Sequence, residues 1–127
     1  MTEHEKDVAF DRLIQEYDLR DRELDEQMRI LTKEKRKLEE RESEIFHFRR
    51  ELDELCLRLA ETAGEGESAF FFYANEQAAT AGLQTEEQLR EEKERLDVEM
   101  TRLRMQKEDT YEEKMRKLRQ LEEDPDP

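Results

Sequence analysis

Apolar residues recur at every seventh position through the first half of the chain. The repeat has eight members, which are Phe10, Tyr17, Leu24, Leu31, Leu38, Ile45, Leu52 and Leu59. A stripe with this period runs along one face of an α-helix and is buried against another helix, as in coiled coils. The pattern therefore predicts one long helix over about residues 5–62.

The rows beside this stripe are uneven. The residues four positions after stripe members are Ile14, Asp21, Met28, Lys35, Glu42, Arg49 and Cys56, and those three positions after are Leu13, Arg20, Gln27, Glu34, Arg41, Phe48 and Leu55. Between residues 32 and 44 only Leu38 is apolar. This section buries little apolar surface, so we expect it to be mobile, charge-paired or covered by a partner.

The second half of the chain resumes the heptad pattern. Its apolar positions are Leu89, Leu96 and Leu103 with Met100 beside them, then Tyr111 after a step of eight, Leu118 and Leu121. The pattern predicts a second helix over about residues 68–123 with one register skip before Tyr111.

Two glycines separate the two predicted helices. Gly64 or Gly66 is expected to take the left-handed conformation that ends a helix, and Ser68 to cap the next one, which gives a turn at residues 63–67. The arms on both sides are nearly equal in length. We therefore expect an all-α fold, a long antiparallel two-helix hairpin that forms a single domain over residues 1–127, with a frayed tail at 124–127.

A second irregularity lies in the predicted second helix. Gly82 is a possible helix end, and Thr85 with Gln88 has the spacing of a capping box. The helix is either kinked near residues 82–85 or continuous through a tolerated glycine.

Four consecutive aromatics, Phe70 to Tyr73, follow the predicted turn, and alanines 74, 78, 79 and 81 come after them. Consecutive helical residues point in directions about 100° apart, so two helices cannot bury all four rings. We interpret the set as a partner surface. Alternatively, individual rings cap the hairpin against Leu55, Leu57 and Leu59.

Composition agrees with a narrow seam, because 34% of the residues are apolar and 47% are charged. Helix-forming residues predominate and both prolines stand at the end of the chain, which argues against disorder. The net charge of −14 would repel nucleic acid. The basic cluster at residues 33–37 is flanked by acids and is interpreted as a solvated helix face.

No catalytic chemistry is indicated. His4 and His47 stand 43 residues apart on one predicted helix, without cysteine or histidine neighbours at metal-ligand spacing. Cys56 is the only cysteine and is interpreted as a small apolar seam residue. We expect no enzyme activity, no cofactor and no metal.

The chain also lacks the marks of membrane targeting. Its first residues carry no apolar segment of a signal peptide, and no run of 18 apolar residues occurs. A cytoplasmic protein is expected, which leaves the cell, if at all, together with a partner and without a cleaved signal.

The stretch FFFYANEQ, followed by QLREEKERLDVEMTRLRMQKEDTYEEKMRKLRQLEED, resembles the second helix of the small helical targeting partners (Lap proteins) of LXG toxins in Gram-positive type VII secretion systems. The resemblance covers mainly residues 70–123. It implies a hairpin that lies along the helical domain of a secreted toxin and helps to present it for export. The partner-binding residues expected on this reading are Phe70, Phe71, Phe72, Tyr73, Leu24, Leu31, Leu38, Leu96 and Leu103.

Export motifs of such systems pair an aromatic residue with an acid four positions later. Tyr17 with Asp21 and Phe72 with Glu76 have this spacing, but neither pair follows the hairpin. Tyr17 also belongs to the heptad stripe, so we interpret it as a core residue.

Two alternatives stay open. One is a self-assembling coiled-coil scaffold, in which paired hairpins form a four-helix bundle. The other is a stalk-like accessory protein of a secretion ATPase, which has similar arms but no shared motif. Long helices draw stability from tertiary burial, so with so thin a seam a partner, identical or not, is expected in each case.

Overall fold

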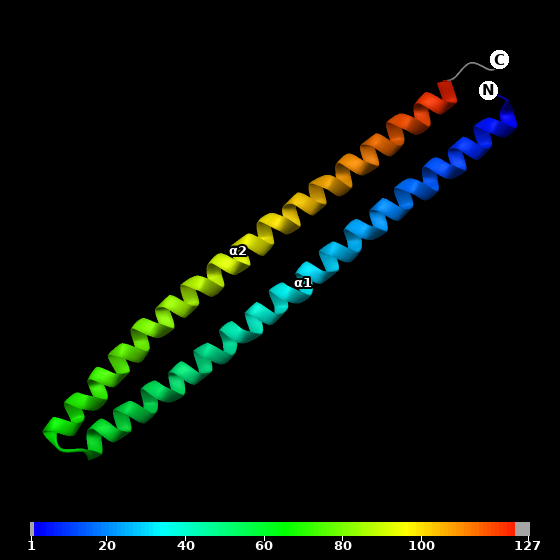
Figure 1. Ribbon diagram of the computed structural model, residues 1–127. Helices are drawn as coiled ribbons and strands as arrows, with labels where there is room; N and C mark the ends of the chain where they lie inside the picture. Colours follow the sequence, from blue (N-terminus) through cyan, green and yellow to red (C-terminus); the bar gives the residue numbers. More distant parts are fainter. Residues whose placement is uncertain (1, 124–127) are drawn as a thin grey trace. The chain divides into compact units, whose positions relative to one another are not determined.

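The chain forms the two long helices that the seven-residue repeat predicts. The computed structural model describes residues 2–123, which contain helix α1 (Glu3–Thr62) and helix α2 (Glu65–Glu123) joined by Ala63 and Gly64 (Figure 1). No strand occurs in this part of the chain. The fold is thus the predicted all-α helical hairpin. The tail predicted to fray at 124–127 lies outside the described residues.

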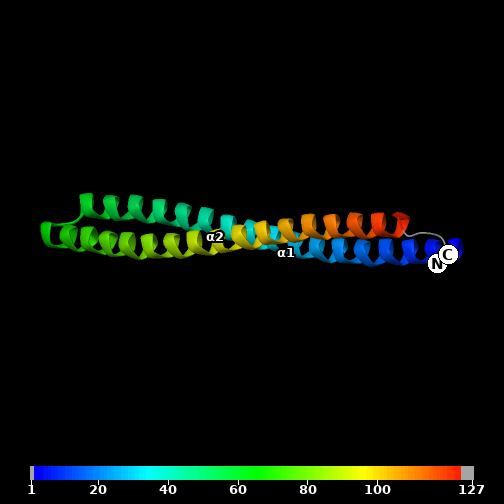
Figure 2. The same ribbon diagram turned by 90° about the horizontal axis from the view of Figure 1, so that it is seen from above.

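The helix pair packs as two units. The terminal unit joins residues 2–32 to 97–123, and the turn unit comprises residues 33–96. Within each unit a segment of α1 lies antiparallel beside a segment of α2, as both views show (Figures 1 and 2).

Helix α1 begins with a capping box. The Glu5 amide donates to Thr2 Oγ1 at 3.2 Å, and the Thr2 amide donates to Glu5 Oε2 at 3.4 Å. These reciprocal bonds satisfy amides that have no partner inside the helix. The cap places the helix start at Glu3, two residues before the predicted one.

The turn is shorter than predicted. Helix α2 starts at Glu65, and the Ser68 amide donates to the Gly64 carbonyl at 2.8 Å, which makes Gly64 the residue that caps α2. No described glycine has a positive φ, so the left-handed turn glycine was a wrong prediction. The proposed capping role of Ser68 was also wrong, because Ser68 already lies inside the first turn of α2.

Helix α2 is continuous through residues 82–85. The Thr85 hydroxyl donates to the Ala81 carbonyl at 3.0 Å, a bond within the helix, and does not cap a new one. Of the two alternatives, the continuous helix is therefore correct.

The core is narrow in both units. Tyr17 and Leu103 are buried in the terminal unit, and Ala60, Leu89 and Leu96 are buried in the turn unit. The half-buried row beside the heptad stripe lies four positions after it, and its members include Asp21, Met28, Lys35, Glu42, Arg49 and Cys56. From Arg20 to Leu55 the row three positions after the stripe is exposed.

The predicted register skip before Tyr111 does not occur. Thr110, seven residues after Leu103, is half-buried, whereas Tyr111 is 62% exposed. The Thr110 hydroxyl donates to the Gln106 carbonyl at 2.7 Å, so it can lie in the seam with its hydrogen bond made. The predicted register skip was wrong because the seam position seven residues after Leu103 is held by a polar residue, Thr110, and not by the next apolar one, Tyr111.

Candidate partner-binding surface

An ion pair lies in the thin middle of the seam in the turn unit. Lys93 Nζ of α2 lies 3.2 Å from Glu42 Oε2 of α1, and both side chains are partly covered. Charge pairing, one of the three states expected for this section, therefore occurs at Glu42.

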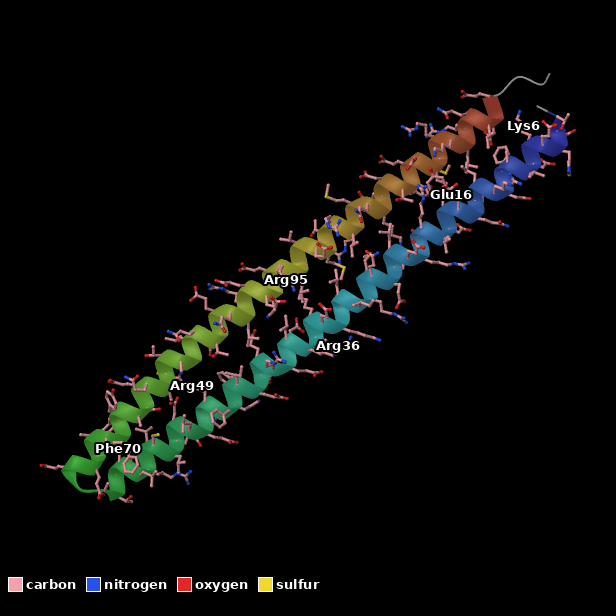
Figure 3. The ribbon with its side chains drawn as sticks, in the orientation of Figure 1. Lys6, Glu16, Arg36, Arg49, Phe70 and Arg95 are labelled. Atoms are coloured by element: carbon pink, nitrogen blue, oxygen red, sulfur yellow. The ribbon has the colours of Figure 1, made fainter. Side chains whose placement is uncertain are left out.

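Arg49 makes a second polar link between the helices of this unit. Its Nη1 donates to the carbonyl of Ala79 at 2.9 Å and lies 3.4 Å from that of Ala78, reaching from α1 across to α2 (Figure 3). A Cβ atom at Gly82 would lie 2.6 Å from the same nitrogen. The small residues of α2 thus make room for a guanidinium against the helix backbone, which explains Gly82.

The four consecutive aromatics behave as helical geometry requires. Phe70, Phe72 and Tyr73 are 64%, 51% and 62% exposed, and only Phe71 is half-buried. Phe70, on the first turns of α2, packs edge-to-face on Phe71 with ring centroids 5.6 Å apart (Figure 3). Three of the four rings therefore lie open on the outside of the turn unit.

Further exposed apolar side chains accompany the rings. On α1 of the same unit, those at least 38% exposed are Phe46, Phe48, Leu55, Leu57 and Leu59, and on α2 Leu83 is 64% exposed. Leu55, Leu57 and Leu59 were considered as packing sites for the rings, yet they remain exposed themselves.

These side chains lie on two opposite flanks of the helix pair. Phe46 and Leu83 line one groove. Leu57 follows Phe46 by eleven residues, three helical turns, and Phe72 precedes Leu83 by the same number, so each keeps its helix face. We call this set the acidic flank; its members are Phe46, Leu57, Phe72 and Leu83.

The other flank is defined by the same geometry. Leu55 and Leu57 stand on opposite sides of the half-buried Cys56, as Phe70 and Phe72 do of Phe71. Phe48 and Leu59 are seven and four residues from Leu55 and share its face. We call Phe48, Leu55, Leu59 and Phe70 the neutral flank.

Charge distinguishes the two flanks. Neighbours on a helix face stand three, four or seven positions apart. Around the acidic flank these positions hold nine acids, which are Glu39, Glu42, Asp53, Glu54, Glu61, Glu65, Glu76, Glu86 and Glu87. They hold three bases, Arg49, Arg50 and Arg90, which gives a balance of 3 − 9 = −6.

The same positions around the neutral flank hold three acids, Glu44, Glu51 and Glu67, and two bases, Arg41 and Arg58, a balance of 2 − 3 = −1. The two flanks thus present equal numbers of exposed apolar side chains with very different charge.

The groove of the acidic flank is open and wide. It encloses about 940 Å³, and its lining residues are Glu39, Glu42, Ser43, Phe46, Leu83, Glu86, Glu87, Arg90 and Lys93. The two bases in it are engaged, since Lys93 pairs with Glu42 at 3.2 Å and Arg90 lies 3.9 Å from Glu87. The groove therefore combines apolar surface with surplus negative charge.

The predicted leucine contacts lie elsewhere. Leu96 and Leu103 are 2% and 1% exposed, packed between the helices of their own units. Leu24, Leu31 and Leu38 are half-buried in the seam. A partner cannot reach Leu96 or Leu103 while the helices are paired, because their apolar surface is already covered.

The terminal unit has a different polar arrangement, centred on Tyr17. The Tyr17 side chain is 1% exposed, with Arg20 4.9 Å and Lys117 5.4 Å from its ring centroid. Its hydroxyl approaches Lys117 and Glu113 but has hydrogen-bonding geometry with no described residue. Tyr17 is thus a core residue, as the heptad stripe predicts.

Neighbouring charged groups in the terminal unit shift one another's pKa values. Lys117, and to a smaller extent the Tyr17 hydroxyl, lower the pKa of the Glu113 carboxyl. A hydrogen bond to Asp25 at 2.6 Å raises the pKa of Lys107. A groove of about 560 Å³ beside Tyr17 is bordered by Lys107 and Lys114, each ion-paired with an acid of α1. Of the three cations that line this groove, Arg104, Lys107 and Lys114, the two lysines are therefore already engaged.

Reactive groups are sparse in the described part of the chain. Residues 2–123 contain no group of three or more histidine, cysteine or acidic side chains arranged to hold a metal ion. Within the same residues, neither helix is both long and apolar enough to cross a membrane. His4 belongs to the terminal unit and His47 to the turn unit.

Comparison with known proteins gave no relative: no protein-family model, curated protein or solved structure matches the chain.

Proposed function

We propose that this protein is a non-enzymatic binding partner that packs the exposed apolar side chains of its turn unit against a helical domain of another protein. One observation carries the proposal. Between Phe46 and Leu83, nine large apolar side chains are exposed on only two paired helix segments. Such surface has an unfavourable free energy in water, and clusters of it mark interaction sites.

The composition of this surface fits a protein interface. Phe70, Phe72 and Tyr73 are large rings, and aromatic residues are enriched among the side chains that contribute most to protein binding. Helical segments dock in this way by inserting apolar side chains between two paired helices.

The resemblance to Lap proteins names the class of partner that we propose. The partner is then the long helical domain of a secreted LXG toxin, and the protein acts as its targeting factor or chaperone for a type VII secretion system. The open rings at residues 70–73 lie at the start of the region that carries the resemblance.

The test is capture from the cell that produces the protein, with mass spectrometry of what co-purifies in fixed ratio. The wild type is compared with a triple variant, Phe70→Ser, Phe72→Ser and Tyr73→Ser. A matched control is Val98→Ser, Met105→Ser and Tyr111→Ser, which changes side chains of the terminal unit that are 70%, 59% and 62% exposed. All six positions are solvent-accessible, so circular dichroism should show unchanged helicity.

We expect one helical partner that the triple variant loses and the control retains. A toxin with a long helical domain would support the targeting role. If the wild type instead forms a defined homo-oligomer by light scattering and retains no other protein, the self-assembling scaffold replaces the proposal.

A further inference from the structure

The two flanks of the turn unit allow the partner to be specified further, on the basis of the proposed function. We infer that the acidic flank binds an amphipathic helix whose apolar stripe is bordered by lysine and arginine. The inference depends on the charge and spacing of the residues around Phe46, Leu57, Phe72 and Leu83.

The spacing on the acidic flank fits a third helix. Phe46 and Leu83 line one groove, and Leu57 and Phe72 each lie eleven residues from them toward the turn, a distance of about 16 Å along either helix. The antiparallel pairing brings Leu57 and Phe72 to the same level. Four exposed apolar side chains thus lie along one flank over a length that matches about three turns of a helix.

The partner's stripe follows from this spacing. A helix that inserts between two others places apolar residues at positions such as i, i+4, i+7 and i+11. The residues on either side of that stripe then meet the acids that surround the four apolar side chains.

Those acids are largely unpaired. Glu39, Glu61, Glu65, Glu76 and Glu86 make no ion pair with a described residue. The bases nearby are already engaged, either within one helix, as Arg50 is with Glu54 at 3.5 Å, or across the pair, as Lys93 is with Glu42 at 3.2 Å. A partner with a basic border would gain charge-assisted contacts, and one with an acidic border would be repelled.

This charge also argues against a second copy of the chain on the acidic flank. A symmetric contact would place the same acids of two copies opposite one another. The neutral flank, with its balance of −1, carries no such penalty. The acidic flank is therefore assigned to a basic helix of a different protein.

The probe for the test is a synthetic three-heptad peptide with leucine at positions a and d and lysine at e and g. Its twin has glutamate at e and g. Binding of each labelled peptide to the full chain is measured by fluorescence anisotropy at physiological salt. We expect the lysine peptide to bind and the glutamate twin to bind at least about tenfold more weakly, the effect of about 1.4 kcal/mol.

Matched variants locate the binding. Phe72→Ser with Leu83→Ser changes the acidic flank, and Phe48→Ser with Leu55→Ser changes the neutral flank at similar exposure. We expect the first pair of substitutions to weaken binding of the lysine peptide about tenfold or more. The second pair should leave its binding nearly unchanged. Circular dichroism confirms that each variant keeps its helices.

Charge reversal tests selectivity independently. Glu76→Lys with Glu86→Lys should reduce binding of the lysine peptide and raise that of the glutamate twin. Equal binding of the two peptides, equal loss from both flank variants, or an unchanged preference after charge reversal would each overturn the inference.

The inference and the proposed function fail separately. If the captured cellular partner survives Phe72→Ser with Leu83→Ser but is lost in the triple variant, the acidic flank is not its site and the proposed function stands. If no partner is captured while the lysine peptide binds only the acidic flank, the proposed function falls and the specificity of the flank remains.

Discussion

The terminal unit buries one of its aromatic rings completely, whereas the turn unit buries none of its own. In the terminal unit Tyr17 is 1% exposed and packs inside the seam, with charged groups of Arg20 and Lys117 beside its ring. In the turn unit Phe70, Phe72 and Tyr73 are all more than half exposed. The same two helices therefore bury the Tyr17 ring in the seam of the terminal unit and leave these three rings of the turn unit exposed to solvent.

Both units have ion pairs between their helices, and in the turn unit Lys93 pairs with Glu42. Cross-helix pairs of the terminal unit include Lys107 with Asp25 and Lys114 with Asp18, so opposite charges meet between the helices. In the turn unit several glutamates around the acidic flank stay without an ion-pair partner. The heptad stripe forms the seam of both units, whereas the residues outside it determine which apolar and charged side chains each unit exposes.

The largest expected difference comes from deleting one aromatic ring in each unit. Tyr17→Ala should lower the free energy of unfolding by about 3 kcal/mol, since it leaves a cavity in the seam. Phe72→Ala removes a ring that is 51% exposed and should cost less than about 1 kcal/mol. Urea unfolding followed by circular dichroism measures both, and equal losses would show that the two units do not differ in this way.

The link between Arg49 and Gly82 should show coupling in a double-mutant cycle. Gly82→Ala alone gains helix propensity of about 1 kcal/mol but displaces the Arg49 guanidinium, so we expect little net change. In an Arg49→Ala background the full gain should appear, which gives a coupling of about 1 kcal/mol. Additive effects in urea unfolding would mean that Arg49 does not occupy the space beside Gly82 in solution.

Tyr17→Phe tests the buried hydroxyl of the terminal unit. Because the hydroxyl lacks hydrogen-bonding geometry with any described residue, its removal should stabilise the protein by about 0.5–1 kcal/mol. Tyr111→Phe is the control at a 62% exposed position and should change the midpoint of unfolding very little. A destabilising Tyr17→Phe would show that the hydroxyl bonds Glu113 or Lys117 in solution.

The smallest effect should come from pH. The pKa of Glu113 is lowered from 4.5, so its stabilising contribution is complete above that value and is lost as the pH falls through the folded pKa. The pKa of Lys107 is raised from 10.5, so its contribution is complete below that value and is lost as the pH rises through the folded pKa.

Melting curves across this range should therefore show slight losses at both ends. Lys107→Met should reduce the loss of thermal stability at alkaline pH. Glu113→Gln should reduce the loss at acidic pH. Both groups are partly solvated, so each change should be smaller than that of Tyr17→Phe. An alkaline loss that persists in Lys107→Met would assign it to other groups.

Several features of the fold were determined by the sequence itself. The seven-residue repeat predicted two helices, because a helix must place such a stripe on one face and bury it. The two glycines between arms of nearly equal length predicted the reversal near Gly64. The repeat also predicted that Tyr17 lies in the core. That not all of the Phe70–Tyr73 rings are buried follows from helical geometry alone, since consecutive side chains point in different directions.

Other features were decided only by the tertiary structure. The choice between the two rows beside the stripe, the place of Thr110 in the seam and the fit of Arg49 against Gly82 depend on how the second helix packs against the first. Phe46 and Leu83 are distant in sequence and form one groove only through that packing. A local pattern specifies which face of a helix is apolar, whereas the surface left uncovered depends on the rotation of both helices about their axes.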